Sequence, residues 1–149
     1  MKFEKYVHTE AGEPFRIFPF GEIFKDGEMR EVTSEMASSF TLPHFKPPIK
    51  LGSHVDTTPA GGHIMALEVR DDGLYAVPEY TEKGNKSIKE GDYRYNSPEI
   101  IWADKAIEDP ETGDWIPGPM IVGVALLHEP HLGEATALYR TRPVDNKET

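Results

Sequence analysis

The stretch HIMALEVRDDGLYAVPEY, residues 63–80, decides the fold of this chain of 149 residues. In an extended chain Ile64, Ala66 and Glu68 share one face and Met65, Leu67 and Val69 share the other, as in a β-strand. The Asp72-Gly73 pair that follows is typical of a tight turn between antiparallel strands. The sequence therefore predicts a β-hairpin of two antiparallel strands here.

Further strands are predicted on both sides of this hairpin. FRIFPFGEIF, residues 15–24, is apolar on both faces, which predicts a strand that is covered on both sides or lies at an edge beside Pro19. YRYNSPEIIW, residues 93–102, alternates as a strand, and DPETGDWIPGP, residues 109–119, is a loop full of turn residues. MIVGVALL, residues 120–127, is a nearly continuous apolar run, which predicts a central, buried strand.

Two short helices are predicted from capping residues. Thr33 or Ser34 is a suitable N-cap for a helix that ends near Phe40, because the prolines that follow prevent its continuation. Thr81 caps a second predicted helix over residues 82–90, which ends at a glycine.

Composition and length define the fold class. Apolar residues make up 38% of the chain and charged residues 28%, with 13 Gly and 13 Pro, which suits a loop-rich β protein better than a helical bundle. The elements together predict an α+β fold, a small β-rich, barrel-like domain of six or seven strands with two short helices. The length predicts one domain over residues 15–140, with an N-terminal lead-in of residues 1–14 and a loose C-terminal tail of residues 141–149.

Charge and cysteine content exclude several classes of partner and chemistry. A formal net charge of −10 without a basic stripe predicts no nucleic-acid partner. The chain has no cysteine, which excludes disulfides, thiolate metal sites and a cysteine nucleophile. The start MKFEKYVHTE lacks the apolar run of a signal peptide, and no apolar run approaches the ~20 residues of a membrane span. These features predict a cytoplasmic protein with no membrane partner.

Ser97 is a candidate nucleophile within the strand predicted over residues 93–102, where valine or threonine would serve the strand at least as well. A serine nucleophile needs a base, usually histidine. His54 is the leading candidate, because Asp56 lies two residues on, where it would share a face with His54 in an extended chain. The alternative is structural, with Ser97 bonded to the backbone before Pro98 and the other two as polar loop residues.

Metal binding is a rival use of the same residues. His44, His54, Asp56 and His63 carry the nitrogen and oxygen ligands that zinc accepts. Their spacing matches no recurrent zinc pattern, such as two histidines one helical turn apart. A metal-dependent hydrolase therefore stays open as an alternative, and it predicts stoichiometric zinc in the purified protein.

Two segments, LGSHVDTTPAGGHIMALEVRDDGLYAVPEYTEKGNKSIKEGDYRYNSPEI and GVALLHEPHLG, resemble the Mu-like phage I proteins, which are capsid maturation (prohead) proteases distantly similar to herpesvirus assemblin. The resemblance runs from about Phe15 to Ala137. Its most specific parts are the histidine before a Pro-Ala-Gly turn, the DDGLYA hairpin, the helix opening TEKG and the strand YRYNSPEI.

The resemblance implies a serine endopeptidase that cleaves scaffold and major capsid proteins inside a procapsid in the bacterial host cytoplasm, without a cofactor and with possible self-association. The family's histidine falls on His54 and its nucleophile on Ser97. Related proteases carry a histidine or an acid at the start of the last core strand, where this chain has Gly123. The third member is therefore assigned to Asp56, with His128 as the second choice.

The resemblance also supports a rival from another class. Such proteases often continue into a charged scaffolding segment, while this chain ends at Thr149, as a processed product or a shorter relative would. Together with the glycine at position 123, this favours a catalytically inactive capsid or assembly protein that shares the protease fold.

Overall fold

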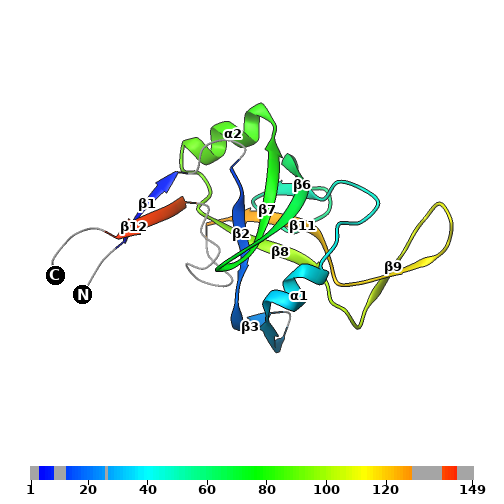
Figure 1. The fold of residues 1–149 in the computed structure, drawn as a ribbon. Coiled ribbons are helices and arrows are strands. Elements are labelled where there is room, and N and C mark those ends of the chain that lie inside the picture. The colour runs from blue at the N-terminus through cyan, green and yellow to red at the C-terminus, as the bar shows by residue number, and fades with distance from the viewer. Residues whose placement is uncertain (1–3, 9–12, 26, 129–138, 144–149) are drawn as a thin grey trace.

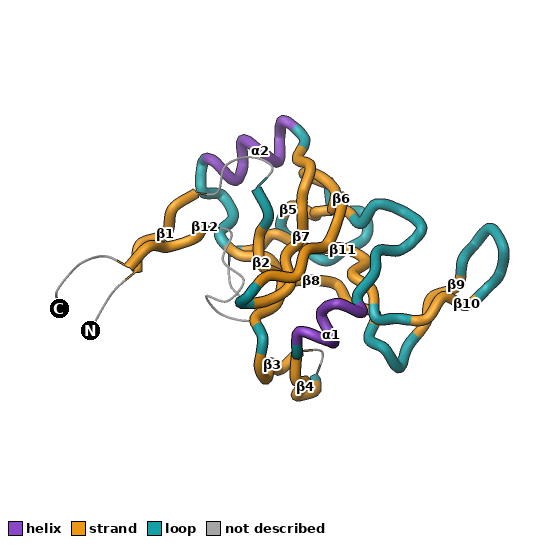
Figure 2. Tube along the Cα trace, viewed as in Figure 1, coloured by secondary structure: helices purple, strands orange, loops and turns teal. Residues whose placement is uncertain are grey.

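The computed structural model describes residues 4–8, 13–25, 27–128 and 139–143, and its centre is one six-stranded sheet (Figures 1 and 2). The strands pair in the order β2 (Phe15–Pro19), β7 (Gly73–Tyr80), β6 (Ala60–Arg70), β5 (Pro48–Leu51), β11 (Met120–Leu127) and β8 (Tyr95–Ile101). All neighbours are antiparallel except β5 and β11, which are parallel. The two edge strands approach each other, since Asn96 Nδ2 on β8 donates to the Arg16 carbonyl on β2 at 3.1 Å. The sheet is thus nearly closed, and the predicted barrel-like α+β fold is confirmed.

Among the described residues, three two-stranded ribbons accompany this sheet. They are β1 (Glu4–His8) with β12 (Tyr139–Pro143), β3 (Gly21–Lys25) with β4 (Glu28–Val32), and β9 (Ala106–Glu108) with β10 (Trp115–Pro117). In Figure 1 the β9–β10 ribbon projects away from the sheet on the side opposite β1 and β12.

The ribbons correct two sequence predictions. The single strand predicted over residues 15–24 is two strands, because Gly21 has a φ of 107° and turns the chain between β2 and β3. The loop predicted over residues 109–119 contains strand β10, which the sequence did not predict because turn-forming residues surround it. The predicted tail of residues 141–149 falls partly in β12 and otherwise outside the described residues.

Two short helices begin at the predicted caps. Helix α1 (Ser34–Ser39) is capped by Thr33, whose Oγ1 accepts from Met36 N at 3.1 Å. Helix α2 (Glu82–Lys89) is capped by Thr81, whose Oγ1 accepts from Gly84 N at 3.0 Å. Each cap satisfies a backbone N–H that has no partner within its helix. In the part of the chain described, neither helix is long and apolar enough to cross a membrane.

The predicted hairpin is β6 and β7, and side-chain contacts fix its turn. Asp72 Oδ2 accepts from Arg16 Nη1 at 3.0 Å and from the Tyr75 hydroxyl at 2.9 Å. These contacts tie the turn to strand β2, which pairs with β7. At the far end of β7, burial raises the pKa of the Tyr80 phenol well above its ordinary value.

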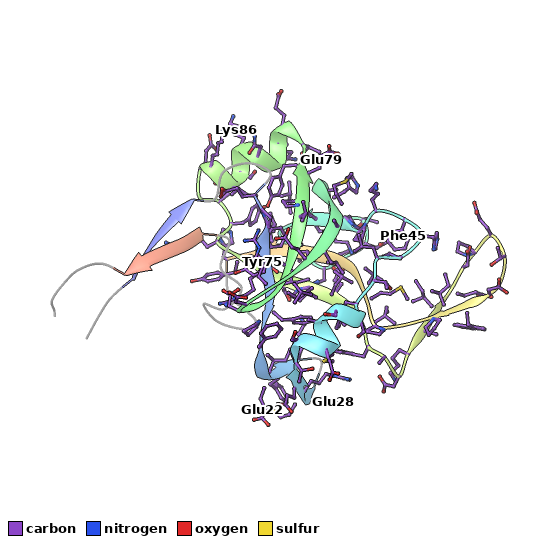
Figure 3. The ribbon with its side chains drawn as sticks, viewed as in Figure 1. Glu22, Glu28, Phe45, Tyr75, Glu79 and Lys86 are labelled. Atoms are coloured by element: carbon purple, nitrogen blue, oxygen red, sulfur yellow. The ribbon has the colours of Figure 1, made fainter. Side chains whose placement is uncertain are left out.

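The core lies between the curled sheet, α1 and the β3–β4 ribbon. Phe18, Phe40 and Trp102 contact one another, with ring centroids 5.4 to 6.2 Å apart. The predicted central strand β11 contributes Val124 and Leu126, both without exposed surface. Charged side chains such as those of Glu22, Glu28, Glu79 and Lys86 lie at the outside of the molecule (Figure 3). Apolar burial of this kind stabilises the fold by roughly 25 cal/mol per Å².

Candidate active site

Strand β8 carries Ser97 and Glu99 on one face. They pair with Ala125 and Gly123 of β11 in regular antiparallel register. Residues two apart on a strand share a face and lie about 6.6 Å apart along it. The intervening Pro98 pairs with Val124, which belongs to the core. The side chains of Ser97 and Glu99 therefore lie on the face of the sheet opposite the core.

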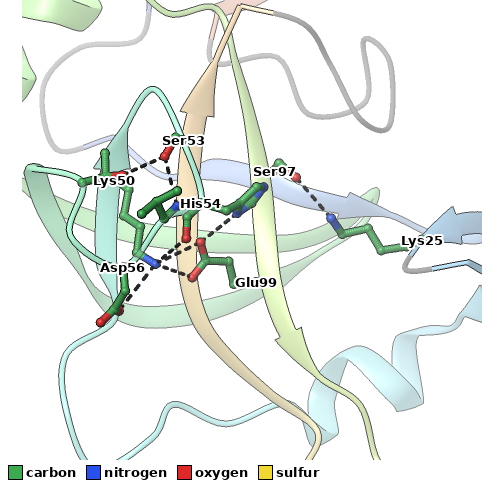
Figure 4. A network of polar contacts seen from close by, with 9 residues as sticks. Lys25, Lys50, Ser53, His54, Asp56, Ser97 and Glu99 are labelled. Carbon is green, nitrogen blue, oxygen red and sulfur yellow. Dashed lines mark hydrogen bonds and ion pairs between the residues drawn. The ribbon is translucent and has the colours of Figure 1, made fainter.

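Ser97 is held by a lysine from a distant part of the chain. Nζ of Lys25 donates to Oγ of Ser97 at 3.1 Å (Figure 4). Lys25 comes from β3, where alternation buries Ile23 and Lys25 and exposes the residue between them. Ser97 has no exposed surface, and Lys25 is 3% exposed. The contact therefore joins two buried polar groups.

His54 and Glu99 form the second contact of the site. The Glu99 carboxylate lies 2.7 Å from Nδ1 of His54, measured to Oε2. Because an ionised carboxylate only accepts hydrogen bonds, Nδ1 is the donor, and Nε2 at the other edge of the ring remains available. Figure 4 draws the ring between the Glu99 carboxylate and Ser97, and no hydrogen bond joins His54 to Ser97 among the described residues.

Lys50 fixes both partners of this contact. Its Nζ donates to Oε1 and Oε2 of Glu99 at 3.0 and 3.2 Å and to the backbone carbonyl of His54 at 3.1 Å. The Lys50 side chain is 7% exposed and the Glu99 side chain 19%, so the pair is largely shielded from solvent. One cation thus orients the carboxylate and holds the segment that carries the histidine.

The loop that carries His54 is closed by short-range hydrogen bonds. Leu51 N donates to the Pro59 carbonyl at 2.9 Å, which brings the two ends of the loop together. Inside the loop the Ser53 hydroxyl lies 2.7 Å from that of Thr58 and accepts from Val55 N at 3.0 Å. Polar residues thus give the loop a defined shape.

Asp56 does not contact the His54 ring. Its side chain is fully exposed, and Oδ1 lies 4.0 Å from Nζ of Lys50. The orienting contact predicted for Asp56 is made by Glu99, because the chain is a closed loop rather than an extended strand between residues 54 and 56. His128, the second choice, packs its ring against Tyr93 with centroids 5.4 Å apart.

Gly123 makes room for Glu99. A Cβ at position 123 would overlap Oε1 of Glu99, the oxygen that Lys50 binds. Strand β11 has a bulge between Ile121 and Gly123, where the register with β8 shifts. The carboxylate beside His54 therefore comes from β8, opposite Gly123 of the neighbouring strand β11.

An open groove adjoins these residues. It has a volume of about 560 Å³ and is lined by Phe45, Pro48, Lys50, Asp56, Glu99, Ile107 and Val122. Ile107 belongs to the projecting β9–β10 ribbon, and Val122 lies at the bulge of β11. The groove places apolar walls beside the carboxylate of Glu99.

The residues of the metal alternative do not gather. Within the described ranges, no group of three or more histidine, aspartate or glutamate side chains has the geometry to hold a metal ion. The His44 ring contacts Phe45 with centroids 5.2 Å apart.

Three charged residues of the site escaped sequence reasoning. Glu99 had a usable signal, because it lies two residues after Ser97 in an alternating strand. Lys50 and Lys25 had none, since Lys25 lies 72 residues from Ser97 and an isolated lysine has no recognisable spacing.

Comparison with known proteins assigns the chain to a family. The model of the Mu-like prophage I protein N-terminal domain matches residues 49–139, which include His54, Ser97, Glu99 and Gly123. Neither the curated proteins nor the solved structures give a match to this chain. Because the matched residues make up more than half of the sequence, the chain belongs to the Mu-like prophage I protein family and is a phage-related protein.

Proposed function

We propose that the protein is a serine endopeptidase that cleaves scaffold and major capsid proteins during phage procapsid maturation. The observation that carries the proposal is the contact of His54 Nδ1 with Glu99 at 2.7 Å, on the strand that also presents Ser97. A carboxylate on Nδ1 fixes the orientation of a histidine and stabilises its protonated form. Family membership supports the assignment of a phage substrate.

The proposed reaction is acyl transfer through Ser97. Nε2 of His54 takes the hydroxyl proton as Oγ attacks the carbonyl carbon of the scissile peptide, and the carbonyl electron pair moves to oxygen. Collapse of this tetrahedral species expels the amine, which receives the proton from the imidazolium. Water then hydrolyses the acyl-enzyme by the same steps and restores Ser97.

The spacing along β8 suits this reaction. Ser97 and Glu99 lie about 6.6 Å apart on one face, which leaves room for an imidazole between them. Glu99 holds one edge of the His54 ring, and Figure 4 draws the ring on the side of Glu99 that faces Ser97. Because Ser97 has no exposed surface in this conformation, cleavage also requires local movement around the hydroxyl.

A coexpression experiment tests the proposal. The chain is produced with its cognate scaffold and capsid proteins as wild type, Ser97→Ala, His54→Asn and Ser38→Ala, and the products are followed by intact mass. Ser38 is a matched control, because it is an exposed serine on α1 whose hydroxyl bonds only locally to the Ser34 carbonyl. We expect cleavage by the wild type and by Ser38→Ala alone. Cleavage by Ser97→Ala would contradict the proposal.

The second candidate function is a catalytically inactive capsid or assembly protein. It is favoured by the complete burial of Ser97 and by its hydrogen bond to Lys25 instead of His54. It predicts that a serine-directed fluorophosphonate labels nothing, whereas the protease predicts one adduct at Ser97. Under either function we propose a location inside the procapsid in the bacterial host cytoplasm.

A further inference from the structure

We propose that Lys25 is a further catalytic residue of this site, whose ammonium group stabilises the Ser97 oxygen as it loses its proton. The inference rests on the proposed function, because it assigns a role within the same acyl transfer. Lys25 is the residue that contacts the reacting atom directly, with Nζ 3.1 Å from Oγ.

A turn and a short ribbon after β2 bring Lys25 to Ser97. Gly21 turns the chain out of β2, and the β3–β4 ribbon then places Ile23 and Lys25 on its buried face. Lysine is among the residues least often fully buried unless it is paired. Lys25 is 3% exposed and donates to a serine without exposed surface, so their contact is shielded from solvent.

A buried cation changes the chemistry of a hydroxyl in two ways. A nearby positive charge favours the deprotonated oxygen, and the effect is stronger where solvent is excluded. The ammonium also occupies one lone pair of Oγ, which directs the hydroxyl proton toward an acceptor other than Lys25. In the proposed step Lys25 donates its hydrogen bond without transferring a proton, and the proton of Ser97 passes to Nε2 of His54.

Other charged groups around β8 act on Ser97 as well. His54 and Glu99 share its face, and Lys50 binds Glu99 from β5. The Glu99 carboxylate opposes ionisation of Ser97, while a protonated His54 favours it. A test of Lys25 must therefore separate its contribution from that of His54.

The absence of cysteine from the chain makes a direct test possible. Ser97→Cys introduces a single thiol, whose ionisation is followed by the ultraviolet absorbance of the thiolate against pH. The same titration is made with Lys25→Met, Lys25→Arg, His54→Asn or Lys46→Met added. Lys46 is the matched control, an exposed lysine in the segment before β5. No substrate or turnover is needed.

We expect Lys25→Met to raise the midpoint of thiol ionisation by about one to three pH units, while Lys25→Arg and Lys46→Met leave it near that of Ser97→Cys alone. The effect of Lys25→Met should persist in the presence of His54→Asn. A midpoint that Lys25→Met does not move would overturn the proposal, since a merely structural lysine would change stability and not the thiol.

Folding of each variant is checked by circular dichroism, and Lys25→Gln replaces Lys25→Met if the latter does not fold. If neither folds, the Ser97→Cys midpoint in the His54→Asn background is compared with that of Ala76→Cys, an equally buried thiol on β7, and a midpoint no lower than this control contradicts a stabilising cation. The two proposals fail separately. An unmoved midpoint with cleavage that depends on Ser97 removes only Lys25, whereas a moved midpoint without cleavage removes the protease.

Discussion

The two polar contacts on β8 differ in burial and in the number of groups that share them. Ser97 is fully buried and bonds to Lys25 from a distant ribbon. Glu99 is partly exposed and bonds to both Lys50 and His54, which is itself 44% exposed. The difference teaches that one strand can shield a hydroxyl and, two residues on, hold a histidine from another segment that stays accessible to solvent. In the proposed protease, shielding strengthens the charge that acts on the nucleophile, and access lets the histidine exchange protons.

The largest effect on activity is expected from a change of Glu99, the acid that contacts His54. Glu99→Gln keeps the shape of the side chain but no longer stabilises a protonated His54, so we expect cleavage to fall about 10⁴-fold. The rate of fluorophosphonate labelling measures the loss. Glu79→Gln, an exposed acid on β7, is the control and should label normally. Equal rates for Glu99→Gln and the control would remove Glu99 from the mechanism.

Lys50→Met tests how much the ion pair between Lys50 and Glu99 contributes to stability. Removing one partner of a largely buried ion pair leaves Glu99 without its cation, and we expect a loss of about 3 kcal/mol in the free energy of unfolding. Urea denaturation measures it, with the exposed Lys46→Met as control. A loss no greater than that of the control would show that the pair contributes little.

Gly123→Ala tests the space that the Glu99 carboxylate occupies. The added methyl group would overlap Oε1, so the carboxylate must shift from its present position, and we expect about 1 kcal/mol of destabilisation together with slower labelling. Gly113→Ala is not a matched control, because Gly113 has a positive φ, so the comparison is made with the wild type. An alanine at position 123 without effect on labelling would separate this strand position from catalysis.

The smallest effect is expected at Asp56. Its side chain is fully exposed and lies 4.0 Å from Lys50 Nζ, so Asp56→Asn should change stability by less than about 0.5 kcal/mol. Labelling should stay within a few-fold of the wild type. A loss comparable to that of Glu99→Gln would restore Asp56 as the residue that orients His54.

The sequence by itself determined the local structure of this protein. Alternation and the Asp72-Gly73 turn predicted β6 and β7, and the threonines at positions 33 and 81 predicted the starts of both helices. These features depend on neighbouring residues, so a pattern along the chain is enough to find them. The family, and with it Ser97 and His54 as candidates, was also readable from motifs in the chain.

Only the tertiary structure decided which groups meet. It gave the His54 contact to Glu99 instead of Asp56, and it brought Lys25 to Ser97 across 72 residues. It also showed that Gly123 leaves room for an acid from the neighbouring strand. The physical reason is that strand pairing and the bending of the chain at Gly21 set these distances, and neither leaves a spacing in the sequence by which charged partners can be matched.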